Sequence, residues 1–446
     1  MKKSRSTKNL GVPAPPRESE KEDGQPGLVP KLRFPEFRAS DMWEHLTLKQ
    51  VTTVLLDGDW IESKDQSDSG YRLIQTGNVG VGEFIAKSGK ARYVSEETFA
   101  RLRCTEIFPG DCLVSRLPDP AGRSCFIPDI GEKMITAVDC TIVRFDQAKI
   151  VPYLFIAHSQ TDGYFREVAA LSSGSTRQRI SRENLSGLSL PLAPTRAEQQ
   201  KIASCLSSLD ELIGAQGRKV DALKTHKKGL MQQLFPREGE TQPRLRFPEF
   251  QNARDWEEYS LGQLIEIASG QVDPKQPPYC DLPQIGSENI ESKSGNVVNV
   301  KTAGEKGVIS GNYAFDENDI LYSKIRPALN KVAAPSFKGI CSADIYPIRP
   351  ADGSLLRGYL FYLLLSQDFL DHAIRNSERG KIPKINRDAL DCYKARIPLP
   401  AEQHRIATCI SLLDALITAE TQKLEALKTH KRGLMQQLFP SPEEAS

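Results

Sequence analysis

The chain carries two copies of the same terminal segments, and this duplication limits its fold more than any other feature. Residues 222–236 read ALKTHKKGLMQQLFP, and residues 426–440 repeat them with a single conservative difference. The hexapeptide LRFPEF stands at residues 32–37 and again, unchanged, at residues 245–250. Because internal repeats mark repeated structural units, the sequence predicts one scaffold present twice, with a pseudo-two-fold relationship between the copies.

The segments between these shared ends have diverged, so residues 51–190 and 264–397 resemble each other only in patches. These patches pair residues 74–79 with 285–290, 110–116 with 318–324, and 174–185 with 380–390. Near-identical ends around unlike inserts favour a common scaffold that holds two domains with different binding properties. A recent duplication without any division of function is the alternative; it explains the shared ends but not the divergence of the inserts.

Length and composition exclude several classes of protein. A single core rarely serves more than about 250–300 residues, so a chain of 446 residues is expected to form two or three domains. No apolar run reaches the roughly 18 residues that a transmembrane helix needs. Residues 1–30 lack the apolar segment of a secretory signal and are expected to be a disordered tail. The nine cysteines form no C-x-x-C pair, which favours reduced thiols in the cytoplasm over disulfides or a zinc site.

The repeated ends have the spacing of long amphipathic helices. Apolar side chains recur at alternating intervals of four and three residues, and the pattern is interrupted at Gln216 and Lys227 in the first copy and at Glu420 and Lys431 in the second. One narrow apolar stripe does not stabilise a helix alone in water, so the two helices are expected to pair in antiparallel orientation. The alternative is that each helix packs only on its own domain.

The predicted helix-pair interface consists of the a and d positions of both heptad patterns. Its members are Ile202, Leu206, Leu209, Ile213, Val220, Leu223, Leu230, Ile406, Ile410, Leu413, Ile417, Leu424, Leu427 and Leu434. Pro236 and Pro440 are expected to end the helices, since proline cannot continue one. Gly214 and Gly217 predict a bend or a loosened turn in the first helix.

The inserts combine short strands and helices in an order typical of an α+β fold rather than of alternating βαβ units. Strands are expected at residues 71–74, 112–114, 141–145, 320–322 and 345–348. Helices are expected at residues 96–102, 153–159, 163–169 and 356–376.

Basic and amide side chains gather in loops at matched positions of the two inserts, which points to nucleic acid. Glycine allows a close approach to phosphate, hydroxyl and basic groups bond its oxygens, and Arg or Gln can read base edges. The candidate contacts of the first insert are Asn78, Ser115, Arg116, Ser175, Thr176, Arg177, Gln178 and Arg179. Those of the second insert are Asn289, Ser323, Lys324, Arg326, Lys381 and Lys384. A solvated surface loop is the alternative for each stretch taken alone.

No constellation of catalytic residues is apparent, and none is assigned. The chain has no G-x-x-x-x-G-K-[ST] phosphate loop. Gln276-Pro277-Pro278-Tyr279 resembles the Asn/Asp-Pro-Pro-aromatic element of amino-group methyltransferases, but glutamine is too long and no cofactor loop precedes it. Two of the six histidines, His226 and His430, lie in the repeated helix ends, where surface or interface roles are expected. The other four have no neighbouring metal-type partners in sequence, so no metal site is expected.

Taken together, these segments resemble the specificity subunit of type I restriction–modification systems. The resemblance rests on the duplicated layout, on the helix starts at residues 191–202 and 398–406, and on the two GLMQQLFP ends. It implies an α+β fold with two globular target recognition domains, separated by a pair of long antiparallel coiled-coil helices in a pseudo-two-fold internal repeat.

The resemblance also implies a division of the chain into named parts. They are a disordered tail at residues 1–30, target recognition domain 1 at 31–193, a first spacer helix at 194–236, target recognition domain 2 at 237–397, a second spacer helix at 398–440 and a tail at 441–446.

For function, the resemblance implies a non-catalytic chain that binds a bipartite, asymmetric target in double-stranded DNA. Its expected partners are two methyltransferase subunits, which carry S-adenosylmethionine, and two restriction subunits, which use ATP and Mg²⁺. No cofactor is expected in this chain itself, and no membrane partner. Two alternatives from other classes remain open: a coiled-coil scaffold without sequence-specific DNA contact, and a self-contained DNA methyltransferase or nuclease.

Overall fold

The computed structural model describes residues 28–440 except Ser88, Lys90, Asp119, residues 175–177 and Arg379. The chain divides into two compact units. The first unit contains the residues up to Ala215 and those from Leu424 onward, and the second contains Gln216–Lys423. Each unit therefore holds one insert together with parts of both long helices.

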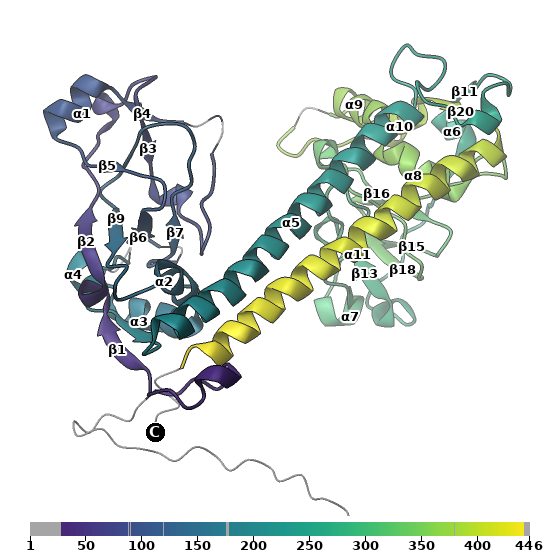
Figure 1. Cartoon of the computed structure of the whole chain (residues 1–446). Helices are drawn as coiled ribbons and strands as arrows, with labels where there is room; N and C mark the ends of the chain where they lie inside the picture. The colour runs from purple at the N-terminus through teal and green to yellow at the C-terminus, as the bar shows by residue number, and fades with distance from the viewer. Residues whose placement is uncertain are drawn as a thin grey trace, which may run out of the picture. The chain divides into compact units, whose positions relative to one another are not determined.

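The two long helices are α5 (Arg196–Leu234) and α11 (Pro400–Leu438), each of 39 residues (Figure 1). In the first unit the beginning of α5 packs with the end of α11, and in the second unit the end of α5 packs with the beginning of α11. The helices are thus antiparallel partners. α5 stays helical through Gly214 and Gly217, so the loosened turn expected there is not found. Backbone hydrogen bonds and the partner helix outweigh the small helix penalty of two glycines.

The first unit contains three sheets. Their strands are β1 (Glu44–Thr47), β2 (Thr52–Asp57), β3 (Tyr71–Ile74), β4 (Tyr93–Val94), β5 (Glu106–Ile107), β6 (Cys112–Ser115), β7 (Ser124–Phe126), β8 (Met134–Thr136), β9 (Cys140–Phe145) and β10 (Ser189–Leu192). The strand orders are β1-β10, β2-β9-β6-β7 and β4-β3-β8-β5. Within the last sheet, β3 and β8 are parallel, and the other pairs in these sheets are antiparallel.

The second unit repeats this topology strand for strand. Its strands are β11 (Glu257–Ser260), β12 (Ile265–Ile267), β13 (Pro283–Ile285), β14 (Lys301–Thr302), β15 (Asn312–Phe315), β16 (Ile320–Ser323), β17 (Val332–Ala333), β18 (Gly339–Ser342), β19 (Ile345–Pro350) and β20 (Lys394–Ile397). The orders are β11-β20, β12-β19-β16-β17 and β14-β13-β18-β15. The inserts have therefore kept one fold although their sequences have diverged.

Short helices cover these sheets. In the first unit they are α1 (Glu96–Leu102), α2 (Pro152–His158), α3 (Asp162–Leu171) and α4 (Arg182–Ser186). In the second they are α6 (Leu261–Leu264), α7 (Ala303–Lys306), α8 (Arg357–Leu365), α9 (Gln367–Arg375) and α10 (Arg387–Asp391). The single helix expected at residues 356–376 is wrong, because Ser366 ends α8 and its hydroxyl accepts the Phe369 N–H at 3.3 Å to cap α9.

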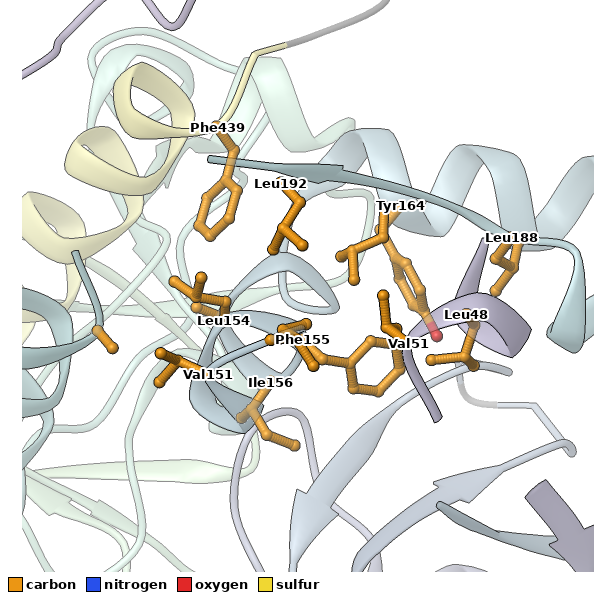
Figure 2. Packing of buried hydrophobic residues seen from close by; sticks show 14 of the residues in the cluster. Leu48, Val51, Val151, Leu154, Phe155, Ile156, Tyr164, Leu188, Leu192 and Phe439 are labelled. Atoms are coloured by element: carbon orange, nitrogen blue, oxygen red, sulfur yellow. The ribbon is translucent and has the colours of Figure 1, made fainter. Parts of the chain in front are cut away.

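The core of the first unit lies between α2, α3, the strands and the last turn of α11. Figure 2 shows Phe439 reaching from the end of α11 toward Leu154 and Leu192. Trp43 packs edge-on against Phe439, with ring centroids 6.2 Å apart. Leu28, which precedes the expected boundary at residue 31, is buried in the same cluster and pairs with Trp43.

The repeated LRFPEF hexapeptide joins each domain to both helices. In the first unit, the guanidinium of Arg33 bonds both carboxylate oxygens of Glu198 on α5, at 2.7 and 2.8 Å. Leu32 donates its backbone N–H to Gln437 of α11 at 2.9 Å. In the second unit, Arg246 makes the equivalent bidentate pair with Glu402 of α11, at 2.8 Å for both bonds. Such planar, charge-assisted pairs fix orientation as well as contributing energy.

Candidate nucleic-acid interface

In both units, the end of one strand lies beside the loop that precedes a short helix. In the first unit, Ile180 in the loop before α4 donates its N–H to the backbone oxygen of Arg116, which follows β6, at 3.2 Å. In the second unit, Ile385 before α10 donates to Lys324, which follows β16, at 3.0 Å. The two stretches that the sequence singled out in each insert are therefore neighbours in space.

Backbone hydrogen bonds close the base of each loop. Ser173 and Arg179 exchange backbone hydrogen bonds of 3.0 and 2.9 Å in the first unit. In the second unit, Glu378 donates to Lys384 at 2.8 Å, and Lys384 also bridges to Ile325. The predicted contacts Ser175, Thr176 and Arg177 lie outside the described residues.

Carboxylates hold the arginines of the first interface. Arg116 forms an ion pair with Asp57 at 3.2 Å and donates to the Val138 carbonyl at 2.6 Å. Arg179 pairs with Asp139 at 2.9 Å, and Arg182 lies 4.0 Å from Asp57. Burial lowers the pKa of Arg116 from its ordinary value, a shift that the nearby Asp57 charge opposes. The result is a cluster of three cations oriented by two acids.

In the second interface, two cations lie near the ring of Tyr346. The Lys324 ammonium lies 5.2 Å from the centroid of the Tyr346 ring, and the Arg387 guanidinium lies 5.6 Å from it. Lys384 is 3.9 Å from Asp344, which corresponds to the Arg179–Asp139 pair of the first unit. Cations over an aromatic face are attracted by the ring quadrupole, so this cluster orients its positive charges with fewer direct carboxylate contacts.

The predicted contacts fall into two groups. Five side chains are buried and bonded internally: Asn78, Ser115, Arg116, Asn289 and Ser323. The asparagines hold equivalent turns, since each side-chain oxygen accepts a backbone N–H three residues earlier, at 3.0 and 2.9 Å. The exposed or half-exposed group consists of Gln178, Arg179, Lys324, Arg326, Lys381 and Lys384. Direct DNA contact by any of these residues stays a prediction.

Several residues of the two clusters were absent from the sequence prediction. They are Asp57, Asp139 and Arg182 in the first unit, and Asp344, Tyr346 and Arg387 in the second. A constant offset of 205 residues relates two pairs of these positions between the copies: Asp139 with Asp344, and Arg182 with Arg387. That offset was a usable signal for these pairs, whereas nothing in the sequence joined Asp57 to the cluster.

The predicted helix-pair stripe is the shielded face of both helices. All of its positions on α5 and α11 are buried or half-buried. By contrast, Leu212, Leu412 and Leu416 on other faces are 46%, 65% and 43% exposed. Ile202 and Leu206 join the core of their own domain together with Met435 and Leu438 of the other helix. The start of each helix thus packs on its domain and on its partner at the same time.

Polar residues that interrupt the heptads meet one another or a partner acid. Gln216 donates to Glu420, and Lys219 makes an ion pair with the same carboxylate. Lys431 bonds Asp210 at 2.6 Å in the first unit, and Lys227 pairs with Asp414 in the second. These interruptions are therefore interface contacts, and polar pairs in an apolar seam specify register.

Each acid of the helix pair also accepts a tyrosine from the neighbouring domain. Tyr153 donates its hydroxyl to Asp210, and Tyr362 donates to Asp414 at 2.9 Å. Burial, together with the adjacent carboxylate, raises the pKa of both phenols, which keeps them protonated as donors. In each unit, a contact between a tyrosine, an aspartate and a lysine thus joins the domain to α5 and α11.

Other kinds of site have no support in the described part of the chain. There, no three His, Cys, Asp or Glu side chains come together as a metal site would require. Within those same residues, no helix has the length and apolarity needed to cross a bilayer.

Comparisons with known proteins agree with this architecture. The model of the Type I restriction modification DNA specificity domain matches the chain twice, over residues 40–225 and 253–429. The EcoDI specificity subunit of Escherichia coli is 29% identical over 59% of this chain, and the match spans 64% of that relative, less than two thirds of its length. The putative MjaX specificity subunit of Methanocaldococcus jannaschii is 24% identical over 89% of this chain and 92% of its own.

Two solved structures share the fold. The S subunit of the type I restriction-modification system from M. genitalium has a TM-score of 0.56 and 13% identity, over 93% of this chain and 99% of its own. A chain from a study of complex assembly and conformational transition in the type I R-M system has a TM-score of 0.52 and 16% identity, over 89% and 97%. The domain match covers most of the chain and occurs once in each half. The chain therefore belongs to the family of type I restriction–modification DNA specificity subunits and carries the family's specificity domain twice.

Proposed function

We propose that this chain selects the DNA sequence on which a type I restriction–modification complex acts, with each domain reading one half of a split target. The observation that carries the proposal is the pair of cationic clusters around Arg116 and Lys324. They occupy equivalent places in two domains of identical topology, yet differ in their side chains. Basic side chains position phosphates, and arginine, lysine and glutamine distinguish base edges.

The two halves of the target are expected to differ in sequence. Arg and Lys both favour the guanine edge, whereas Asn or Gln favours adenine. The exposed contacts predicted for the first domain include Gln178, and those predicted for the second are lysines and an arginine. Arginine is also a planar fork, whereas lysine is a flexible point charge. Arg116 is replaced by Lys324 at the equivalent position, and Arg179 by Lys384. A pseudo-symmetric frame with unlike contacts therefore reads an asymmetric bipartite sequence rather than a palindrome.

The helix pair is proposed to set the distance between the two half-sites. A helix of 39 residues is about 58 Å long at about 1.5 Å per residue. Successive contacts on one face of a duplex are about 34 Å apart, one helical turn. Helices of this length can therefore space two half-sites with unread base pairs between them, and the polar pairs along the seam keep their register fixed.

The catalytic steps are assigned to partner subunits. Leu212 and Leu416 lie at equivalent positions of α5 and α11, and both are exposed, as is Leu412. Exposed apolar residues of this kind suit protein docking, so the outer helix faces are proposed to bind two methyltransferase subunits with their S-adenosylmethionine. Two restriction subunits that use ATP and Mg²⁺ would complete the complex in the cytoplasm.

The test is to reconstitute the chain with the methyltransferase subunits of its host and measure methyl transfer and binding on a defined split target. The chain alone should transfer no methyl group, the methyltransferase alone should lack sequence choice, and the complex should methylate adenine in both half-sites. Methyl transfer by the chain alone would indicate a self-contained enzyme. A complex that assembles but has equal affinity for target and unrelated DNA would indicate a scaffold.

A further inference from the structure

We propose that Asp57, and its replacement by serine in the second domain, makes the two domains bind DNA with different dependence on charge. In the first domain, the arginines are held by an acid before DNA arrives. In the second domain, Lys324 and Arg387 have no such acid in direct contact, so they remain available to phosphates and supply most of the sequence-independent attraction. This inference rests on the proposed DNA-binding function and assigns Asp57 the role of a specificity-determining residue.

The position equivalent to Asp57 follows from strand register. In the first unit, Leu55 lies opposite Val143 and Asp57 lies opposite Thr141. In the second unit, Ile267 lies opposite Ile348, and Ala268 donates its N–H to Pro347 at 2.9 Å. The next residue, Ser269, therefore falls beside Tyr346, as Asp57 falls beside Thr141. β9 and β19 are both six residues long, which leaves no shift in the count.

Asp57 connects three side chains of the first interface. Its carboxylate accepts a hydrogen bond from the Thr141 hydroxyl at 3.0 Å and pairs with Arg116 at 3.2 Å, with Arg182 at 4.0 Å. The Arg116 side chain is 6% exposed and that of Asp57 23%. A phosphate that approached these arginines would meet charges already compensated, whereas a base edge could use the remaining, oriented donors of Arg182.

The second domain has lost both partners of that arrangement. Tyr346 stands where Thr141 stands in the first domain, and Ser269 carries no charge. Among the described residues, neither Lys324 nor Arg387 is within 4.0 Å of a carboxylate. Asp391 is the nearby acid that feels the Arg387 charge, which opposes the rise in the Asp391 pKa caused by burial. The ring of Tyr346 attracts both cations without placing a carboxylate in direct contact with them.

Counterion release makes this difference measurable. Each phosphate neutralised by a protein cation contributes about −0.9 to the slope of log K against log salt concentration. The full chain, with its methyltransferase partners, is titrated with the target duplex, with duplexes in which one half-site is scrambled, and with an unrelated duplex of equal length. Binding that depends on the second half-site is expected to show the steeper dependence of log K on log salt concentration.

Opposite substitutions at Asp57 and at its equivalent, Ser269, test the role of this position. Asp57→Asn keeps the size of the side chain and a hydrogen-bond acceptor but removes the charge. It should therefore steepen the slope of log K against log salt concentration at the first half-site by up to ~0.9 and tighten binding to the unrelated duplex. Ser269→Asp, at an exposed position, should flatten the slope at the second half-site by a similar amount. Ser269→Asn is the matched neutral control and should leave the slope unchanged.

The outcomes separate this inference from the proposed function. Target binding with unchanged slopes in both charge variants would overturn the role of Asp57 while leaving sequence selection intact. Absence of sequence preference in the unmodified complex would overturn the function itself. Because Asp57→Asn removes the counter-ion of a buried arginine, its melting temperature is measured in parallel. If that variant unfolds, Ser269→Asp decides the question alone: an unchanged slope rejects the inference.

Discussion

Gln216 of α5 donates hydrogen bonds to the backbone oxygen of Glu420 on α11 at 2.9 Å and to its carboxylate at 2.7 Å. These residues are 204 positions apart, the offset that also separates the repeated helix ends at residues 222–236 and 426–440. The two copies therefore meet at equivalent positions, one neutral and one charged.

Gln216→Glu should therefore weaken the helix pair. The substitution brings a second carboxylate against Glu420, with only Lys219 to compensate, so the melting temperature should fall by several degrees at neutral pH. Hydrogen bonds from Lys219 and Gln216 lower the pKa of Glu420, so its stabilising contribution is present above the ordinary pKa of a glutamate and is lost on acidification. The defect of the variant should accordingly shrink as the pH falls toward 4.

Glu420→Gln is the matched control for that prediction. It leaves two amides that can bond each other, so it should cost less than Gln216→Glu. Calorimetry of both variants at two pH values checks the pair. Equal melting temperatures for Gln216→Glu and the unmodified chain would show that the contact does not specify the pairing.

Lys431→Met should destabilise the first unit by about 2 kcal/mol, a value between those of exposed and buried ion pairs. The Lys431 side chain is 9% exposed and its partner Asp210 is 40% exposed, so solvent screens part of the interaction. Without Lys431, the Tyr153 hydroxyl is the remaining partner of Asp210 among the described residues.

Lys227→Met is the control, because Lys227 occupies the equivalent position in the second unit and pairs with Asp414. Hydrogen exchange of backbone amides, measured peptide by peptide, should show loosening of the first unit in Lys431→Met and of the second unit in Lys227→Met. The same exchange pattern in both variants would contradict the assignment of one contact to each unit.

Acid should destabilise the first unit through His158. The imidazole packs between Tyr164 and Phe439, with ring centroids 5.7 and 5.6 Å away, and burial lowers its pKa from 6.5 to about 4. The unfolded chain binds a proton near pH 6.5 and the folded chain does not. Stability is therefore lost as the pH falls below 6.5, by about 2 kcal/mol at pH 5 and about 3 kcal/mol near pH 4.

His158→Phe should remove this part of the acid sensitivity. Urea unfolding at pH 7 and pH 5, followed in the first unit by hydrogen exchange, gives the comparison. The unmodified chain should lose more stability between the two pH values than the variant does. An equal loss in both would mean that His158 is already protonated, or equally titratable, in the folded domain.

Trp60 should report DNA bound to the first domain. Its side chain is 70% exposed, whereas the other tryptophans, Trp43 and Trp256, are 3% and 6% exposed. It lies three residues after Asp57, the last residue of β2. Acrylamide should quench its fluorescence in the free chain, and a duplex carrying the first half-site should protect it by severalfold. Trp60→Phe should abolish the quenchable signal, and protection by the second half-site alone would contradict this placement.

The sequence predicted the parts of the fold that depend on regular spacing. The heptads placed α5 and α11, and the short apolar runs placed strands such as β3 and β6, because periodicity is a local property. It did not reveal that Ser366 separates α8 from α9, since a capping hydroxyl within an apolar run looks like an ordinary helix residue. The shared sheet order of the two inserts was also hidden, because a fold persists while its side chains change.

The sequence predicted the loops of the candidate interface but not all of the residues that meet there. Loops around Arg116 and Lys324 were found from matched sequence patches, and the structure places each beside the second loop predicted for its domain. Asp57 and Tyr346 were missed because they reach the cluster through strand register, which the sequence does not display. Asn78 and Asn289 are buried because their side chains bond the backbone of equivalent turns. The residue type alone does not distinguish such an asparagine from an exposed one that could contact DNA.

The most direct test of the central claim is to map methylated adenines in the DNA of cells that carry either the unmodified chain or a chain with one heptad inserted at matched positions of α5 and α11. The account predicts two unlike half-sites at a constant separation. In the variant, the same half-sites should be separated by about three more base pairs, because seven helical residues add about 10.5 Å. A single contiguous motif, or a separation that stays the same when both helices are lengthened, would contradict it.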